Sequence, residues 1–267
     1  MVNLVKILRQ VEKAVLKASK ILLKDDYAIM QKDSAINLVT QADIDVQNAL
    51  VIELKKILPQ AGFIGEENHL DDSDKEYCWV IDPIDGTFNF IKGIAHIGIS
   101  VGLIKDKQPI LGVVYNPFAK DLYTAAQGHG AYRNGKQIHV SNAPFEKSIM
   151  CTAMSLYNKD LAKTCSDVIY DVYMQANDVR RFGTSAMELC YLAAGLIELY
   201  FEIRVFPWDY AGGYAILKEA GGLLYSLHGK ELAFDGPVPL IGANSKENFD
   251  KLSAIVDKYI KEIPYKE

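Results

Sequence analysis

The apolar positions of this 267-residue chain follow different patterns in successive segments. Residues 3–24 repeat apolar side chains at the spacing of one helix face, and a second such pattern runs from about Ala42 to Leu58. The second helix is expected to stop before Pro59, because proline cannot continue a helix. The polar stretch 25–37 between them has no period and predicts a loop.

A strongly alternating segment follows. "GFIGEEN" predicts a short strand that ends in acidic residues, and residues 97–140 alternate with turn signals every few residues, which predicts an antiparallel meander. We expect turns at Lys105–Gln108, Asn116–Lys120 and Asn134–Gly135. Gly128 and Gly130 are assigned to bulges, because neither G-x-G-x-x-G nor a P-loop is present.

Beyond about residue 146 the pattern changes to alternating strands and helices. Strands are predicted at 148–154, 178–183 and 197–203, and helices at 158–173, 185–196, 208–222 and 245–260, with one strand pair before the last helix. The expectation is therefore an α/β (α+β) fold of two intimately packed subdomains, 1–145 and 146–267, which together form one functional domain.

Composition narrows the class of protein. Hydrophobic residues make up 49% and charged residues 24%, as in a soluble globule, and the net charge of −5 with scattered basic residues argues against nucleic acid as a partner. The four cysteines form no C-x-x-C and are predicted to be buried free thiols. The N-terminal helix lacks the features of a signal peptide and no segment is apolar enough to span a membrane, so we expect a cytoplasmic protein.

The stretch "CWVIDPIDGTFNF" places Asp82 and Asp85 directly after an apolar run. A turn explains Asp-Pro and Asp-Gly alone. Further acids follow other apolar elements, however, and each has its own local explanation: Glu66 and Glu67 as a solvated pair, and Asp43 and Asp209 as helix caps. The hypothesis is that all of these junctions converge on one pocket.

Six carboxylates need cations to share a pocket. Two unit charges about 4 Å apart repel by roughly 4 kcal/mol at an effective dielectric near 20. Oxygen ligands select hard ions such as Mg²⁺, Mn²⁺ or Ca²⁺, and the scattered histidines argue against zinc. Two or three Mg²⁺ would nearly balance the acids, and a bound phosphate would complete their coordination.

The "DPIDGT" stretch fits that chemistry. Asp82 and Asp85 can reach metals from either side of Pro83, and the Ile84 carbonyl can add an oxygen. Gly86 lacks a Cβ, so its backbone can approach a phosphate, and its N–H and that of Thr87 would lie at a helix N-terminus. The Thr87 hydroxyl can orient a water.

Three blocks, "GEE" at 65–67, "DPIDGT" at 82–87 and "WD" at 208–209, resemble the signatures of the inositol monophosphatase family in order and spacing. "NLVTQAD", "VVYNP", "GAYRNG" and "GTSAMELCYLAAG" extend the resemblance over nearly the whole chain. It implies a layered αβαβα fold, Mg²⁺-dependent hydrolysis of small phosphate monoesters with Mn²⁺ as a substitute, inhibition by lithium, and a homodimer.

The resemblance also implies roles for individual residues. The first metal would bind Glu66, Asp82 and the Ile84 carbonyl, and the second Asp82, Asp85 and Asp209, with Glu66 also near a weaker third ion. Thr87 with Asp43 would position and deprotonate the attacking water, supported by Glu67. The implied substrate contacts are Gly86, Thr87, Gly183, Thr184, Ser185, Glu202 and Lys32, and Ser185 stands where relatives often have alanine.

Other readings stay open. On the same site the substrate would be fructose 1,6-bisphosphate, a 3′-phosphoadenosine nucleotide or NADP, with Arg180, Arg181 or Arg204 meeting a second phosphate. A non-catalytic regulatory protein on this scaffold is a second alternative. A metal-free hydrolase with two carboxylates, such as a glycosidase, is a third alternative. It would not need the N–H groups of Gly86 and Thr87 as a phosphate-binding site.

Overall fold

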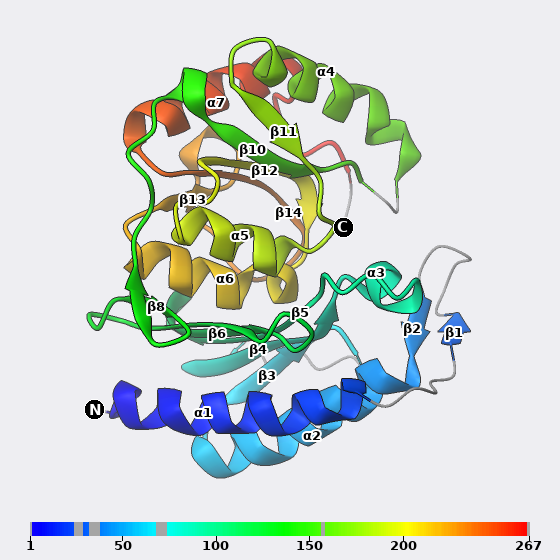
Figure 1. Ribbon diagram of the computed structural model, residues 1–267, viewed down its shortest axis with the longest axis vertical. Coiled ribbons are helices and arrows are strands. Elements are labelled where there is room, and N and C mark those ends of the chain that lie inside the picture. The colour runs from blue at the N-terminus through cyan, green and yellow to red at the C-terminus, as the bar shows by residue number, and fades with distance from the viewer. Residues whose placement is uncertain (1, 24–28, 32–37, 68–73, 156–157, 266–267) are drawn as a thin grey trace.

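A computed structural model describes residues 2–23, 29–31, 38–67, 74–155 and 158–265. The elements stack in five layers (Figure 1): helices, a seven-stranded sheet, helices, a five-stranded sheet and helices. The outer pair α1 (Leu4–Ala18) and α2 (Gln41–Ile57) covers the first sheet. Helices α5 (Ser185–Ala193) and α6 (Pro207–Glu219) lie between the sheets, and α4 (Ala162–Tyr173) and α7 (Lys246–Tyr259) cover the second. This arrangement confirms the predicted layered fold.

The first sheet contains the predicted meander. Its spatial order is β3 to β9, and its strands are β3 (Gly62–Gly65), β4 (Tyr77–Asp85), β5 (Gly98–Lys105), β6 (Gln108–Asn116), β7 (Asp121–Ala126), β8 (Ala131–Arg133) and β9 (Lys136–Ile138). Only the β3–β4 pair is parallel. The three predicted turns join β5 to β6, β6 to β7 and β8 to β9, and both residues of Asn134–Gly135 have positive φ, as a tight hairpin turn requires.

The second sheet has the order β11-β10-β12-β14-β13. Its strands are β10 (Ile149–Ala153), β11 (Asp178–Arg180), β12 (Leu199–Val205), β13 (Leu223–Tyr225) and β14 (Val238–Ala243). β10 pairs in parallel with β11 and β12, whereas β14 runs antiparallel to β12 and β13. The predicted boundary near residue 146 falls between the last strand of the first sheet and the first strand of the second.

Glycines let α6 lie directly on the first sheet. A Cβ built on Gly112 of β6 would lie 2.2 Å from the carbonyl oxygen of Gly212 in α6, and one built on Gly102 of β5 would lie 2.9 Å from the backbone of Ala211. Real Cβ atoms do not approach so closely, so only glycine fits at these positions. The close packing matters for the site, because Asp209 lies in the first turn of α6.

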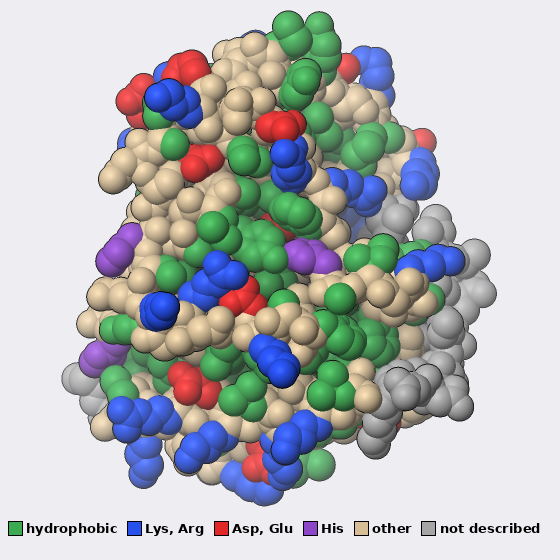
Figure 2. Space-filling model, in the orientation of Figure 1, with side chains coloured by type: hydrophobic (Ala, Val, Ile, Leu, Met, Phe, Trp, Pro, Cys, Tyr) green, Lys and Arg blue, Asp and Glu red, His purple; other side chains and the backbone are tan. Residues whose placement is uncertain are grey.

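The exposed side of α1 carries basic residues. Its apolar face, including Ile7, Val11 and Val15, is buried against the sheet, which leaves Lys and Arg side chains in solvent. In Figure 2 several Lys and Arg side chains lie along the lower edge of the visible face, over α1 and α2. Lys17, in the last turn of α1, pairs with Glu53 of α2 at 2.8 Å.

Some local predictions were wrong or only partly right. The first helix is α-helical only to Ala18 and continues as a 3₁₀ turn, η1 (Ser19–Leu23). The expected loop at 25–37 contains β1 (Ile29–Gln31), which pairs with β2 (Leu38–Thr40); the rest of that segment lies outside the described residues. Gly128 and Gly130 lie in the β7–β8 turn, where their N–H groups donate to the Glu219 carboxylate at 3.0 and 2.9 Å.

The short elements α3 (Thr87–Ile91), η2 (Phe145–Lys147), η3 (Lys159–Leu161) and η4 (Leu227–Gly229) complete the structure. All four cysteines, Cys78, Cys151, Cys165 and Cys190, are buried free thiols. Within the described part of the chain, no helix combines the length and apolarity needed to cross a bilayer.

Candidate active site

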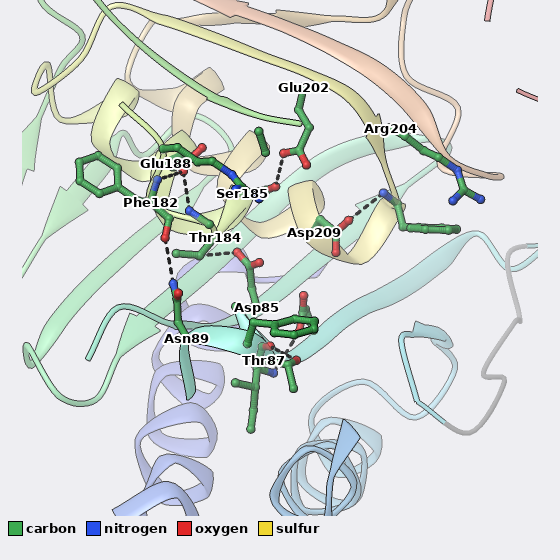
Figure 3. A pocket seen from close by; sticks show the side chains of 18 of the residues that line it. Asp85, Thr87, Asn89, Phe182, Thr184, Ser185, Glu188, Glu202, Arg204 and Asp209 are labelled. Atoms are coloured by element: carbon green, nitrogen blue, oxygen red, sulfur yellow. Dashed lines mark hydrogen bonds between the residues drawn. The ribbon is translucent and has the colours of Figure 1, made fainter. Parts of the chain in front are cut away.

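A pocket of about 440 Å³ opens between the two sheets, where the end of β4 meets the first turns of α5 and α6 (Figure 3). Its walls come from segments far apart in sequence. The lining includes Glu66, Asp82, Ile84, Asp85, Gly86, Thr87, Gly183, Thr184, Ser185, Glu202 and Asp209. The fold therefore brings together most of the residues that the sequence selected.

The "DPIDG" stretch is the irregular end of a buried strand rather than a free turn. β4 pairs with β5 through Asp82 and again at Asp85, with a register shift between them. Pro83 has no N–H to give to the ladder, and the Asp82 carboxylate accepts the Ile84 N–H at 3.0 Å. The shift thus places two buried carboxyls close together at the mouth of the pocket.

Gly86 turns the chain from β4 into the short helix α3. Its φ of +92° is a conformation that only glycine adopts without strain. A Cβ there would also lie 3.2 Å from the carbonyl oxygen of Gly183. Both the backbone conformation and the close Gly183 carbonyl therefore favour glycine at position 86. This turn sets the position of Thr87.

Thr87 links the pocket to α2. Its hydroxyl oxygen lies 3.1 Å from the Ile84 carbonyl and 3.3 Å from the Asp43 carboxylate, and its single proton can be donated to one of them at a time. The second Asp43 oxygen accepts the Thr40 N–H at 2.7 Å and the Thr40 hydroxyl at 2.5 Å. Asp43 therefore serves as a helix cap, as its position predicted, and also faces Thr87.

Two further aspartates are held by backbone N–H groups. Asp85 accepts the Thr184 hydroxyl at 2.5 Å and the Ala186 N–H at 2.6 Å, both on the same oxygen. Asp209 accepts the Phe206 N–H at 2.8 Å at the start of α6. In each case these bonds use one carboxylate oxygen, which orients the group within the pocket wall.

The pKa values of the pocket aspartates are raised, in part because their negative charges lie close together. Burial raises the pKa of Asp82 well above its usual range, and the charges of Glu66, Asp85, Asp209 and Asp43 raise it further. Burial and the neighbouring Asp85 and Glu66 likewise raise the pKa of Asp209 well above its usual range. Burial raises the pKa of Asp85 to about 7, although hydrogen bonds from Thr184 and Ala186 oppose the rise.

This donor set fits hard cations. Among the described residues, no three His, Cys, Asp or Glu side chains already enclose an ion-sized space. The carboxyls nevertheless converge closely enough to raise one another's pKa, and a divalent cation would relieve that repulsion. All the donors are oxygens, including the Ile84 carbonyl on the pocket wall, and oxygen donors suit Mg²⁺, Mn²⁺ or Ca²⁺.

The far wall of the pocket carries a further acid, Glu202, and two hydroxyls that bind it. Glu202 on β12 accepts hydrogen bonds of 2.8 Å from Ser185 and from Tyr200, both on the same oxygen. Burial raises the pKa of Glu202, and these two bonds oppose the rise. The second Glu202 oxygen takes no part in these two bonds, and the carboxyl lies on the pocket wall beside Ser185 (Figure 3).

Three residues selected from the sequence, Asp43, Glu67 and Arg180, do not line the pocket, and Asp43 lies behind the Thr87 hydroxyl. Glu67 is buried but is not part of the pocket lining, and its backbone N–H and carbonyl bind the Gln47 side chain at 3.0 and 2.5 Å. Lys32 lies outside the described residues. Arg180 pairs with Asp178 at 2.5 Å rather than lining the pocket.

Other lining residues were not all selected from sequence. Arg181 and Arg204 line the pocket, as one alternative reading required. Asn89 and Glu188 line it too, and the sequence analysis selected neither of them. Asn89 follows the "DPIDGT" block by two residues, a hint that was available, but Glu188 lies in an apolar helical stretch with no such signal.

Comparison with known proteins agrees with this geometry. Residues 2–261 match the profile of the inositol monophosphatase family. Inositol monophosphatase 1 of Solanum lycopersicum is 37% identical over 73% of this chain and 74% of its own length. The fructose-1,6-bisphosphatase/inositol-1-monophosphatase of Aquifex aeolicus is 33% identical over 97% and 98%, and Nus factor SuhB of Escherichia coli K12 is 32% identical over 81% and 84%.

Solved structures share the fold. The extragenic suppressor protein suhB from Bartonella henselae superposes with a TM-score of 0.87 at 30% identity, covering 96% of this chain and all of that one. An inositol monophosphatase from Anabaena gives 0.85 at 28% identity, with 97% and 98% covered. Fold, site and relatives together define a phosphoric monoester hydrolase. The chain belongs to the inositol monophosphatase family.

Proposed function

We propose that this protein is a Mg²⁺-dependent phosphatase that hydrolyses inositol 1-phosphate or a similar polyol or sugar phosphate. One observation carries the proposal: Asp82 and Asp85 at the end of β4 and Asp209 at the start of α6 crowd one pocket beside Gly86 and Thr87. A pocket of about 440 Å³ is in the range of small-ligand sites.

The metal ligands would be those that the family resemblance implies. Glu66, Asp82 and the Ile84 carbonyl would hold one ion, and Asp82, Asp85 and Asp209 a second, with Glu66 near a weaker third. When bound, Mg²⁺ stabilises charge on phosphoryl oxygens and lowers the pKa of water. The hydrogen bonds from Thr184, Ala186 and Phe206 hold Asp85 and Asp209 in place for this role.

Thr87 and Asp43 would handle the attacking water. Thr87 lines the pocket, and the Asp43 carboxylate lies behind its hydroxyl at 3.3 Å. When the Thr87 proton points to Asp43, the Thr87 oxygen can accept a hydrogen bond from a water in the pocket, and it can take the proton of that water as it passes its own proton to Asp43. Glu67, although it does not line the pocket, would support the site electrostatically from behind.

The rest of the pocket would bind the ester. The N–H groups of Gly86 and Thr87 would approach the phosphate. Gly183, Thr184 and Ser185 would contact the polyol, and Glu202 would accept a hydrogen bond from one of its hydroxyls. Lys32 is proposed to approach the site from the segment before α2. We further propose that the protein works in the cytoplasm as a homodimer and is inhibited by lithium.

A bisphosphate substrate is the second candidate. Arg181 and Arg204 line the pocket, and guanidinium groups pair well with phosphate. The Aquifex aeolicus relative, whose name includes both fructose-1,6-bisphosphatase and inositol-1-monophosphatase, aligns with 97% of this chain. The same arginines would serve a 3′-phosphoadenosine nucleotide or NADP.

A regulatory role is the other candidate. The relative from Escherichia coli carries the name Nus factor SuhB, so a protein of this family can be named for something other than catalysis. Loss of catalysis would be expected to remove metal ligands. All the ligands expected from the resemblance are present in this sequence, which favours an enzyme.

A phosphate-release assay tests the proposal. Inositol 1-phosphate, fructose 1,6-bisphosphate, a 3′-phosphoadenosine nucleotide and NADP are compared at millimolar Mg²⁺ and after chelation. We expect release from at least one ester with Mg²⁺, none after chelation, and inhibition by tens of millimolar lithium. No release from any ester would contradict the enzymatic proposal and favour the regulatory one.

A further inference from the structure

The backbone at Phe182 and Gly183 is held from two sides by side chains that the mechanism above does not use. On one side the Glu188 carboxylate accepts the N–H groups of Phe182 and Gly183 at 2.9 and 3.0 Å, both on one oxygen. On the other side the Asn89 amide donates to the Phe182 carbonyl at 2.8 Å. Figure 3 shows both sets of bonds meeting at this segment.

Asn89 anchors the segment to the first half of the chain. Its amide also donates to the His96 carbonyl at 2.8 Å, so both of its protons are used. Gly183 has a φ of +82°, and a Cβ built on it would lie 3.5 Å from the Asn89 nitrogen. The segment thus rests on α3, which begins at Thr87.

Glu188 anchors the same segment to α5. Its side chain is 1% exposed, whereas Phe182 is 37% exposed, so a buried carboxyl holds the N–H groups of a surface segment. Burial and the neighbouring Glu202 raise the pKa of Glu188 well above its usual range. Burying a carboxyl costs free energy, and an apolar helix-forming residue at position 188 would avoid that cost. The presence of Glu188 therefore indicates that its oxygen atoms have a role.

The next two residues make the contacts on which the site depends. Thr184 donates to Asp85 and Ser185 donates to Glu202. We infer that Asn89 and Glu188 are positioning residues of the substrate site, which together fix the Phe182–Gly183 backbone so that Thr184 and Ser185 face Asp85 and Glu202. The expected effect on turnover rests on the proposed function. The restraint on the Phe182–Gly183 backbone can be tested whether or not the protein is an enzyme.

Amide hydrogen exchange at Phe182 and Gly183, measured by NMR on the full chain, tests the restraint without any substrate. In Glu188→Ala we expect exchange at both amides to rise by at least about tenfold, because their acceptor is lost. Glu188→Gln retains an acceptor oxygen and should stay within about threefold of wild type. Unchanged exchange in a folded Glu188→Ala protein, or equal acceleration in both variants, would overturn the inference.

Turnover gives the second readout. We compare kcat/KM for inositol 1-phosphate with that for p-nitrophenyl phosphate, whose leaving group has no ring hydroxyls. Glu188→Ala and Asn89→Leu should lower the ratio by about tenfold or more, since small misplacements of substrate-contacting groups are costly. A merely structural role would lower both values equally and would contradict positioning.

The two readouts separate the two claims. If the wild-type protein hydrolyses no phosphate ester, the proposed function fails, and the exchange experiment still decides whether the two side chains hold the segment. If Glu188→Ala does not fold, Asn89→Leu decides it, because this variant removes the hydrogen bond to the Phe182 carbonyl. Unchanged amide hydrogen exchange in Asn89→Leu, together with a wild-type ratio of the two kcat/KM values in that variant, would then overturn the inference.

Discussion

The Thr184 hydroxyl donates a 2.5 Å hydrogen bond to Asp85, a residue 99 positions earlier in the chain. The bond joins the end of a strand in the first sheet to the segment that leads into α5. Both residues are buried. Asp85 is thereby fixed by the other half of the molecule, so the proposed metal site and the fold depend on each other.

Replacing Asp85 tests its proposed part in metal binding. We expect Asp85→Asn to lower phosphate release by at least about 100-fold, because an amide is a weaker ligand for Mg²⁺ than a carboxylate. The fold should persist, since the amide oxygen can still accept from Thr184 and Ala186. Steady-state kinetics and circular dichroism measure the two effects.

Thr184→Val is the matched control for Asp85→Asn. It removes the 2.5 Å bond but keeps the carboxylate, so it should lower activity less than Asp85→Asn does. Wild-type turnover by Asp85→Asn would remove Asp85 from the mechanism.

The stability of the metal-free protein should fall as pH rises. Asp82, Asp85 and Asp209 have folded-state pKa values above their unfolded value near 4, so the folded state binds more protons. Their contribution to the free energy of unfolding is fully present below pH 4. It is lost as the pH rises through their folded-state pKa values, about 7 for Asp85. Thermal unfolding in chelator between pH 5 and 8 measures the slope.

Mg²⁺ should oppose that loss, because it binds the ionised acids of the folded state only. Saturation at about 100 times the Kd would add roughly 2.7 kcal/mol to the free energy of unfolding. Asp85→Asn should flatten the pH slope in chelator, because it removes one of the carboxyls whose pKa is raised in the folded state. A wild-type melting temperature that ignores millimolar Mg²⁺ at pH 8 would count against the site.

Ser185→Ala tests the substrate wall. The change removes one of two 2.8 Å hydrogen bonds to Glu202, so the carboxyl should be held less firmly and should become less acidic. We expect KM for inositol 1-phosphate to change by about three- to tenfold, the effect of roughly 1 kcal/mol, with little change for p-nitrophenyl phosphate. Substrate-saturation kinetics measure both.

Tyr200→Phe removes the other bond to the same Glu202 oxygen and provides the comparison. Tyr200 is fully buried, so this variant should lose stability as well, and its melting temperature separates that effect from binding. Identical kinetics for Ser185→Ala and wild type on every ester would exclude Ser185 from substrate selection.

Gly112→Ala tests the packing that positions α6. The added methyl would lie 2.2 Å from the Gly212 carbonyl oxygen, which belongs to a packed backbone, so α6 must shift. We expect a loss of about 1–3 kcal/mol in the free energy of unfolding and weaker Mg²⁺ binding, because Asp209 lies three residues before Gly212. Urea unfolding and isothermal titration measure the two.

Gly98→Ala is the milder comparison, because its methyl would lie 3.2 Å from the flexible side chain of Met187. Equal stability of the two variants would show that the close approach of β6 and α6 has little energetic weight.

The sequence predicted the helices, the meander and most of the pocket lining for identifiable reasons, whereas the layered arrangement was implied by the family resemblance. Periodic apolar positions placed α1, α2 and the meander, and Asp82, Asp85 and Asp209 were visible because acids directly after apolar runs are unusual. Local explanations also held, since Asp43 and Asp209 do accept N–H groups at the starts of their helices. A residue can thus cap a helix and line a site.

What the sequence did not predict depends on contacts between distant segments. Glu188 looked like an ordinary helix position, and only the folded chain shows its carboxyl beneath Phe182 and Gly183. Glu67 was selected with Glu66, but both residues lie in a bend after the end of β3, and of the two only Glu66 lines the pocket. The shift in register between Asp82 and Asp85 likewise had no sequence signal beyond Pro83.

The most direct test is an anomalous-difference map from a crystal grown with Mn²⁺ and phosphate. The account predicts at least two Mn²⁺ peaks in the pocket, one bound by Glu66 and Asp82 and one by Asp82, Asp85 and Asp209. A map without a peak in this pocket, or with the Asp209 carboxylate directed away from Asp82, would contradict it.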